Sequence, residues 1–555
     1  MPDVSRIPPA PESELSSAVR VRTRDGVMLA GDVYFPGAPD EPDTTPGDTI
    51  LIRLPYDKSG TYCFIPQIAE YFTRHGYRVL AQDVRGKFRS EGDALLFVNE
   101  VDDGYDTIEW ITQQPWSNGR VAMWGDSYYG YTQWAAAAGG HPALKAISPR
   151  VTGTGLGEPV RHDPGSRTRS VEWGITYMYP LTHFFDRDML LWEPDWSRRE
   201  FAAQAEEVIE QIGRRSLSYD QWYPHPVLLP RFPAGDPFAG RSVPVLHTIG
   251  WWDNCAPLSW ADVERIRQHP NWDAHHYLRI ESIDHESFQL LEADEDRVMD
   301  RSEQQIRALL PRTLDPALAF FDVFVRGNGT PADLPRVAWD LAHGEGMRES
   351  ASWPPSGAAG VTLYATEEGG LHAGRPSDAA TLQWQHDPDD LVPSSADDAF
   401  SFLLFKPDEA PIGERADVLR FETSVLPADV DLAGPVTARL RVASDGPVMD
   451  CFVRVLDVSP DGTALRVARG QRQLVDATEG GTLDIDLGQI GYRLRAGHRL
   501  RVHVSSSDYP EFLPQTGTGA DPWTWGETHV NTQSLTVGGP DAFTLTLTVL
   551  EGDLP

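Results

Sequence analysis

The stretch Arg120-Val-Ala-Met-Trp-Gly125-Asp-Ser127-Tyr-Tyr-Gly130 decides how this chain is interpreted. It joins an apolar run to a glycine and a serine, and a segment rich in helix formers follows at residues 131–138. A buried strand, a tight turn and a helix in this order predict a nucleophile elbow, in which a strained turn presents the serine hydroxyl. An ordinary strand-to-helix turn capped by Asp or Ser fits the same pattern. Whether Ser127 is a nucleophile therefore depends on whether the chain supplies an acid and a base elsewhere.

Composition limits the class of protein. A chain of 555 residues is too long for one core, so two or three domains are expected. A hydrophobic content of 40%, with 17 Trp, 17 Tyr and 21 Phe, favours packed cores over disorder. The formal net charge of -34 repels phosphate groups, so we expect neither nucleic acid nor a membrane as a partner.

The N-terminus and the cysteines indicate the compartment. The first residues lack the apolar segment of a signal peptide, which favours a cytoplasmic location. Cys63, Cys255 and Cys451 are odd in number and widely spaced, so they predict neither a disulfide framework nor a metal-ligand cluster. We expect no metal and no other cofactor, and self-association into a homo-oligomer is left open.

The order of predicted strands and helices divides the chain. Residues 1–17, rich in Pro and Ser, predict a flexible N-terminal arm. Residues 18–151 and 242–330 alternate apolar strands with helices, which predicts a parallel sheet covered on both faces. Residues 152–241 lose the strand signal and predict an inserted helical cap. In residues 331–555 short strands alternate apolar with polar side chains, which predicts a jelly-roll β-sandwich. The fold class is thus α/β plus all-β.

Two later strand ends offer partners for Ser127. Reactive groups of an open parallel sheet gather at the carboxyl ends of its strands. Asp253 follows one predicted strand of the sheet, and His285 lies just past the next. The chain order Ser, Asp, His is that of the α/β-hydrolases, in which the imidazole deprotonates the hydroxyl and the carboxylate fixes the imidazole tautomer. These three residues form the predicted catalytic triad.

Neighbouring residues compete for two of these roles. His247 lies inside an apolar strand, and His275 and His276 begin one, so none is placed as well as His285. Asp284 is adjacent to His285 in sequence and is therefore badly oriented to hold that imidazole.

Five motifs occur in one order along the chain. They are Pro55-Tyr-Asp-Lys58, Gln82-Asp-Val-Arg-Gly86, Gly125-Asp-Ser-Tyr-Tyr-Gly130, Gly250-Trp-Trp-Asp253 and Val502-His-Val-Ser-Ser-Ser-Asp-Tyr-Pro510. Together they resemble the cocaine esterase/X-Pro dipeptidyl-peptidase family of α/β-hydrolases, from about residue 18 to the C-terminus. The resemblance implies an α/β-hydrolase core, an inserted helical cap and a C-terminal jelly roll.

The resemblance also implies an activity and a role for each site residue. Ser127 would be the nucleophile, Asp253 the acid and His285 the base of a serine esterase or acyl hydrolase. The hydroxyl of Tyr56 and the backbone amide of Tyr128 would bind the oxyanion. The implied substrate is a small carboxylic ester, with an amide as the alternative.

The chain departs from the family pattern on both sides of the predicted base. Asn, Cys and Ala follow Asp253, where relatives that bind an α-ammonium place carboxylates. An X-Pro dipeptidyl-peptidase is therefore a second choice. The segment 281–284 before His285 also differs from the Gly-Pro-Trp type of the relatives. Cys255 is an unsuitable nucleophile because no elbow surrounds it.

Other interpretations stay open beside the esterase. An acyltransferase could use the same triad. A catalytically dead binding protein is disfavoured because the triad residues and the tyrosine are all present. Aromatic residues of the cap favour an apolar acyl or alcohol group; they are Trp173, Phe184, Phe185 and Trp192. Asp83 and Arg85 are expected to brace the core and not to contact substrate.

Overall fold

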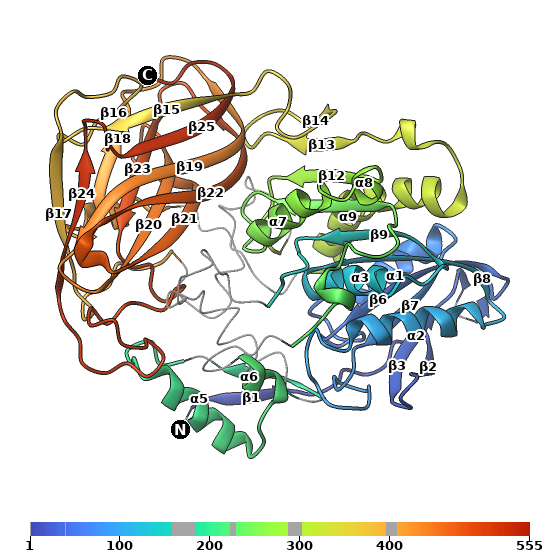
Figure 1. Ribbon diagram of the computed structural model, residues 1–555. Helices are drawn as coiled ribbons and strands as arrows, with labels where there is room; N and C mark the ends of the chain where they lie inside the picture. The colour runs from blue at the N-terminus through green and yellow to red at the C-terminus, as the bar shows by residue number, and fades with distance from the viewer. Residues whose placement is uncertain are drawn as a thin grey trace.

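The computed structural model describes residues 2–38, 40–157, 185, 187–192, 194–222, 229–286, 302–395 and 408–555. They form an α/β unit, blue to yellow-green in Figure 1, and a β-rich unit, yellow to red, that lie side by side. Within the described ranges, no helix has both the length and the apolar character that a membrane crossing requires.

A ten-stranded sheet organises the α/β unit. Its strands are β2 (Ser17–Arg22), β3 (Met28–Tyr34), β6 (Gly47–Leu54), β7 (Arg78–Asp83), β8 (Ser117–Asp126), β9 (Leu144–Arg150), β11 (Val245–Gly250), β12 (His276–Glu281), β13 (Val337–Asp340) and β14 (Met347–Ser350). They are ordered β14-β13-β12-β11-β9-β8-β6-β7-β3-β2. The strands from β13 to β7 are parallel, whereas β14, β3 and β2 pair antiparallel at the two edges. The carboxyl ends of the parallel strands therefore share one edge.

Helices cover both faces of this sheet. They are α1 (Ile65–Arg74), α2 (Glu100–Thr112), α3 (Ser127–Gly139), α7 (Ala256–Ile266), α8 (Pro270–Asp273) and α9 (Glu303–Phe321), which continues into a π-helical turn (Asp322–Arg326). On β6, Ile50 and Ile52 join a core with Phe72 of α1, whereas Leu51 joins a second core with Ile108 of α2. Burial on both faces explains why the apolar residues of the strand do not alternate with polar ones at residues 50–52.

The boundary after the α/β unit differs from the prediction. The sequence places it at residue 330, but β13 and β14 lie in the ten-stranded sheet, so this unit extends to residue 350. Val337 and Trp339 of β13 are buried with Ile280 of β12. A four-residue strand at the edge of a parallel sheet has the same pattern as a sandwich strand, so the sequence could not separate them.

The N-terminal segment also differs from the prediction. Residues 1–17 are expected to be a flexible arm, yet Val4–Ile7 forms strand β1, which pairs antiparallel with β10 (Met189–Trp192). The cap prediction for residues 152–241 likewise overlooked β10. Two short strands distant in sequence stabilise each other only after folding, so neither gives a local signal. Helices α5 (Phe201–Ile212) and α6 (Leu217–Trp222) lie in the same part of the chain.

The β-rich unit contains two sheets. Its strands are β15 (Ala359–Ala365), β16 (Leu371–His372), β17 (Ala380–His386), β18 (Leu419–Glu422), β19 (Val430–Ser444), β20 (Val448–Val458), β21 (Ala464–Val475), β22 (Gly481–Leu494), β23 (Arg499–Ser505), β24 (Asn531–Val537) and β25 (Thr544–Glu551). One sheet runs β16-β15-β25-β19-β24-β17 with β22 also on β19, and the other runs β18-β23-β20-β21. Ala438, Leu440 and Val442 of β19 share one buried core with Val453 and Val455 of β20. The apolar side chains of the predicted alternating strands thus lie on the inner faces, where the two sheets pack against each other.

Short elements complete the chain. They are the two-stranded ribbon of β4 (Gly37–Ala38) and β5 (Glu41–Pro42) and the 3-10 turns Pro233–Gly235, Pro331–Asp333, Ala410–Glu414 and Ala477–Glu479.

Candidate active site

Ser127 lies at a sharp junction between strand and helix. Strand β8 ends at Asp126, α3 begins at Ser127, and Ser127 has a left-handed φ of 50°. A Cβ atom on Gly125 would lie 2.2 Å from Cδ2 of Tyr129, and one on Gly130 would lie 2.5 Å from Cγ2 of Thr152. Only glycine fits these two positions. This is the geometry that a nucleophile elbow requires.

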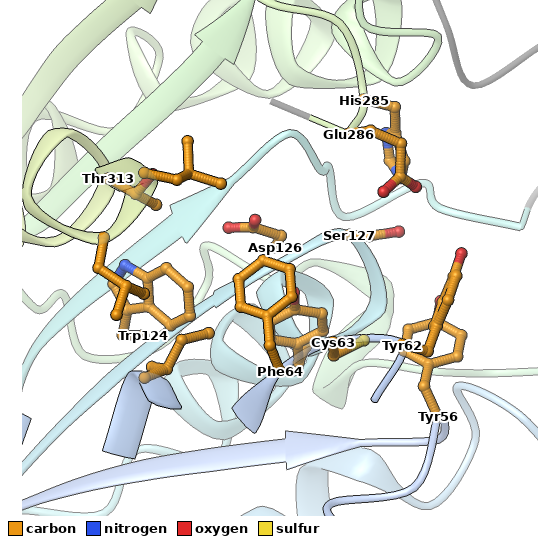
Figure 2. Close-up of a pocket in the computed structure, with 14 residues that line it drawn as sticks. Tyr56, Tyr62, Cys63, Phe64, Trp124, Asp126, Ser127, His285, Glu286 and Thr313 are labelled. Atoms are coloured by element: carbon orange, nitrogen blue, oxygen red, sulfur yellow. The ribbon is translucent and has the colours of Figure 1, made fainter. Parts of the chain in front are cut away.

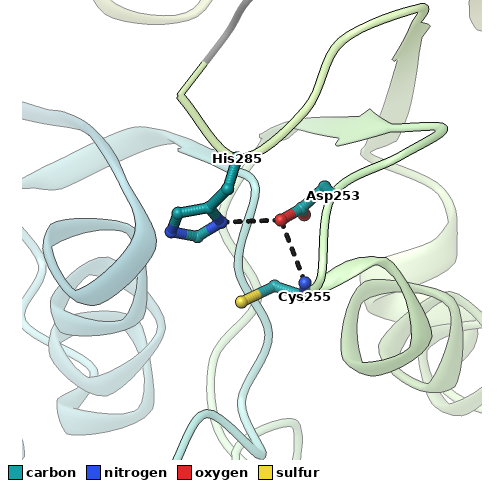
Figure 3. A group of neighbouring side chains, drawn as sticks. All are labelled: Asp253, Cys255 and His285. Atoms are coloured by element: carbon teal, nitrogen blue, oxygen red, sulfur yellow. Dashed lines mark hydrogen bonds and ion pairs between the residues drawn. The ribbon is translucent and has the colours of Figure 1, made fainter. Parts of the chain in front are cut away.

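Asp253 and His285 meet above neighbouring strands. They follow the carboxyl ends of β11 and β12, and Nδ1 of His285 lies 2.6 Å from Oδ1 of Asp253 (Figure 3). The backbone N–H of Cys255 donates to the same oxygen at 2.9 Å. The carboxylate is thus held on two sides and fixes the orientation of the imidazole.

The surroundings of His285 favour its protonated form. Burial acts to lower the pKa of His285, but the neighbouring Cys255 and Asp253 outweigh it and raise that pKa well above its usual value. A general base carries a positive charge once it has taken up a proton, and a buried carboxylate beside the imidazole stabilises that charge.

One pocket collects the predicted residues. It encloses about 750 Å³ when the solvent-filled space at its open mouth is included. The residues that line it are Tyr56, Tyr62, Cys63, Phe64, Ile68, Trp124, Asp126, Ser127, Tyr129, His285, Glu286, Leu309, Leu310 and Thr313 (Figure 2). The structure therefore brings Ser127, His285 and Tyr56 together, with Asp253 behind the imidazole.

The two predicted oxyanion donors differ in what they can offer. Tyr56 follows β6, and its ring lies edge-on to Tyr62 with centroids 5.7 Å apart in the pocket. The hydroxyl of Tyr128 points into the core, where it donates to Oε1 of Glu100 at 2.8 Å and accepts from the amide of Phe97 at 3.0 Å. The predicted role concerns the backbone amide of Tyr128, which lies in the first turn of α3, and not this hydroxyl.

Two carboxylates of the pocket were not predicted. Asp126 pairs with Nε of Arg150 at 2.9 Å, so its charge is already balanced. Glu286 comes directly after His285 and lines the same pocket. Burial and then the charge of Glu286 raise the pKa of Tyr62 well above its usual value. The residues after Asp253 offer no carboxylate, and the sequence did not single out Glu286 as another source of one.

The competing histidines lie elsewhere. Nδ1 of His247 and Nε2 of His276 are 3.3 Å apart in the core. Burial lowers the pKa of His247 to about 4 and lowers that of His276 well below its usual value, so both are neutral packing residues. Arg85 binds Asp103 at 2.5 Å and Asp25 at 2.7 Å, as expected of a brace.

Two of the four aromatic residues of the predicted cap lie away from the pocket. Phe185 and Trp192 are buried with Phe201 and Tyr509 and are absent from the pocket lining. Trp173 and Phe184 lie outside the described residues.

Asp253, Cys255 and His285 could also be considered as metal ligands. Their ligand atoms lie within 4.8 Å of one another, so the structure assembles a cluster that the sequence did not predict. Nitrogen, oxygen and sulfur ligands suit zinc. A short hydrogen bond already joins the carboxylate and the imidazole, however, and a serine at an elbow lines the same pocket. We therefore interpret the pair as acid and base.

The β-rich unit supports the turn that carries Asp253. The indole N–H of Trp252 donates to the carbonyl of Arg466 at 3.0 Å. A Cβ atom on Gly491 would lie 2.6 Å from Trp251, so the two units are in close contact at this point.

Comparisons with known proteins identify the family of this chain. Residues 25–285 match the X-Pro dipeptidyl-peptidase (S15 family), and residues 328–541 match the X-Pro dipeptidyl-peptidase C-terminal non-catalytic domain. The cocaine esterase of Rhodococcus sp. (strain MB1 Bresler) is 30% identical over 553 residues, which cover 91% of this chain and 93% of that protein.

Solved structures share the fold over almost the whole chain. An aminopeptidase of the marine sediment archaeon Thaumarchaeota archaeon has a TM-score of 0.76 at 20% identity and covers 98% of both chains. An α-amino acid ester hydrolase has a TM-score of 0.75 at 21% identity and covers 97% of this chain and 98% of its own. By its motifs, its matched domains and its full-length relative, the chain belongs to the cocaine esterase/X-Pro dipeptidyl-peptidase family.

Proposed function

We propose that the protein is a serine ester hydrolase that forms an acyl-enzyme on Ser127. The observation that carries the proposal is the Asp253–His285 hydrogen bond beside a pocket that Ser127 also lines. A serine hydroxyl attacks a carbonyl only when a base removes its proton, and an imidazole held by a buried carboxylate is such a base.

The first half of the reaction transfers the acyl group to the enzyme. His285 takes the proton from Oγ of Ser127 as that oxygen attacks the carbonyl carbon. The tetrahedral intermediate then collapses, the bond to the leaving oxygen breaks, and the imidazolium donates its proton to the departing alcohol. Asp253 stays ionised and stabilises the imidazolium throughout.

The second half repeats these steps with water. His285 removes a proton from a water molecule, which attacks the acyl carbon. The bond between that carbon and Oγ of Ser127 then breaks, the carboxylic acid leaves, and the imidazolium returns the proton to Oγ. In both halves the hydroxyl of Tyr56 and the amide of Tyr128 would donate to the oxyanion. Each such donor typically stabilises the transition state by about 3 kcal/mol.

We further propose that the substrate carries a protonated amine. Among the described residues that line the pocket, none is Lys or Arg, and Glu286 contributes a carboxylate next to the base. The names of two fold relatives, an aminopeptidase and an α-amino acid ester hydrolase, fit this chemistry. The carboxylate of Glu286 therefore also supports an amide substrate with a free amine, as in an X-Pro dipeptidyl-peptidase. The residues after Asp253 provide no such carboxylate.

A substrate panel tests the proposal. p-Nitrophenyl esters of α-amino acids, their neutral isosteres and X-Pro anilides would be compared on the wild-type protein and on Ser127→Ala. We expect hydrolysis of the amino esters by the wild-type protein and none by the variant, with the exposed Ser352→Ala as the matched control. Turnover by Ser127→Ala would contradict the proposal.

We also propose two finer features of the fold. The two C-terminal sheets, which share one core, would form a jelly roll. Helices α5 and α6 would belong to a cap inserted between β9 and β11.

A further inference from the structure

The turn after Tyr56 is held in a strained conformation. Asp57 has a φ of 69°, in the left-handed region, which costs a non-glycine residue about 1 kcal/mol. Its carboxylate is almost fully buried; Oδ1 accepts from the amide of Ser59 at 3.1 Å, and Oδ2 accepts from the amide of Ala10 at 2.6 Å. One of the two bonds that hold Asp57 therefore comes from the N-terminal segment, 47 residues away.

Arg89 closes this contact. Its guanidinium donates to the carbonyl of Ala10, so the backbone of Ala10 is bound on both sides. The same side chain lies 3.7 Å from Oδ1 of Asp57 and 3.6 Å from the carboxylate of Glu12. Upstream, β1 is fixed by its pairing with β10. The segment from β1 to Glu12 is thus anchored at both ends.

Residues of the core bind the Asp57–Lys58 turn on its other side. The amide of Lys58 donates to Oδ1 of Asp83 at 3.0 Å, and the Lys58 ammonium lies 2.7 Å from Asp32. Asp83 ends the buried strand β7. The turn is therefore bound to core residues through Lys58 and to the N-terminal segment through Asp57.

We propose that residues 4–12 are a strap that fixes the Asp57–Lys58 turn and thereby positions the hydroxyl of Tyr56. The proposal rests on the proposed oxyanion role of Tyr56. A donor displaced by a fraction of an ångström stabilises the transition state less while leaving substrate binding almost unchanged. Pro8, Pro9 and Pro11 restrict the strap before it binds, so less conformational entropy is lost when it docks. Asp57, Ala10 and Arg89 are positioning residues in this account.

Ala10→Pro tests the strap by removing a single donor. Proline has no N–H, so the bond to Asp57 is lost, and Ala10 is already restricted to extended conformations because Pro11 follows it. We expect kcat for an aryl ester to fall about tenfold, less than the loss of a whole oxyanion donor, with KM nearly constant. Ala10→Gly keeps the N–H and is the matched control, with most of the wild-type kcat.

A double-mutant cycle with Tyr56→Phe separates positioning from general stability. Once the hydroxyl is absent the strap has nothing to position, so we expect Ala10→Pro to cause less than a twofold further loss in the Tyr56→Phe background. Arg89→Gln, which removes the bond to the Ala10 carbonyl, should behave in the same way and replaces Ala10→Pro if that variant does not fold.

Two results would contradict the proposed positioning role of the strap. One is wild-type kcat for both Ala10→Pro and Arg89→Gln. The other is a full tenfold loss that persists in the Tyr56→Phe background. Failure of the proposed function is distinguishable, because it appears as turnover by Ser127→Ala. Unchanged activity of Tyr56→Phe alone would remove only the oxyanion role on which the strap depends.

Discussion

Nδ1 of His285 lies 2.6 Å from Oδ1 of Asp253, although 32 residues separate them in the sequence. The contact follows from the fold: β11 and β12 are adjacent and parallel, so the residues that follow their carboxyl ends meet at one edge of the sheet. Ser127 follows β8 at the same edge, so Ser127 and His285 line one pocket and Asp253 lies behind the imidazole.

Tyr56→Phe tests the oxyanion site. The variant keeps the ring and loses the hydroxyl, so we expect kcat to fall about 10² to 10³-fold with little change in KM. Steady-state kinetics on a p-nitrophenyl ester measures this effect. Tyr62→Phe, in the neighbouring ring of the same pocket, is the control and should lose far less. Equal losses in the two variants would contradict a specific role for Tyr56.

Cys255→Ala tests the electrostatics of the base. Cys255 is one of the groups that raise the pKa of His285, and the neutral imidazole is the active form. Removing the thiol lowers that pKa, so the base is deprotonated at lower pH and the acidic limb of kcat/KM moves to lower pH. Cys63→Ala, at the other cysteine near the site, should leave the limb in place. An unmoved limb in Cys255→Ala would show that the thiol does not influence His285.

Glu286→Gln tests the proposed amine site. The substitution removes a charge and little volume, so it should weaken recognition of a protonated amine by the energy of one charge-assisted hydrogen bond. We expect the preference in kcat/KM for an amino ester over its neutral isostere to fall about tenfold or more. Glu345→Gln, an exposed control, should keep the preference. An unchanged preference in Glu286→Gln would place amine recognition elsewhere or exclude it.

Gly125→Ala tests the packing of the elbow. The added Cβ would lie 2.2 Å from the Tyr129 ring, and the backbone has a φ of 155°. We expect loss of activity and destabilisation by about 2 kcal/mol or more in thermal or chemical unfolding. Gly140→Ala has a positive φ of 74° but no atom within 4 Å of the new Cβ, and it should lose only about 1 kcal/mol and remain active. Similar behaviour of the two variants would argue against tight packing at the elbow.

Local patterns predicted the elements that carry the candidate site. The apolar run of β6, whose Ile50 and Leu51 face two different cores, and the glycines around Ser127 have physical causes within a few residues. The strand ends also predicted that Asp253 and His285 lie at one edge of the sheet, because parallel strands share an edge; their catalytic roles stay a prediction.

The sequence did not predict features that depend on residues distant in the chain. Strand β1 exists because β10 pairs with it, and β13 belongs to the α/β unit because β12 lies beside it. Neither partner is indicated by the residues of the strand itself. Glu286 was overlooked for the same reason, since a glutamate after a histidine has no pattern that directs it toward a pocket.

The most direct test of the account is the site of covalent labelling by a fluorophosphonate probe, read by mass spectrometry of the digested protein. We predict one probe adduct on the peptide that contains Ser127, no adduct in Ser127→Ala, and greatly slowed labelling in His285→Ala. An adduct on another residue, or labelling of Ser127→Ala at the wild-type rate, would contradict it.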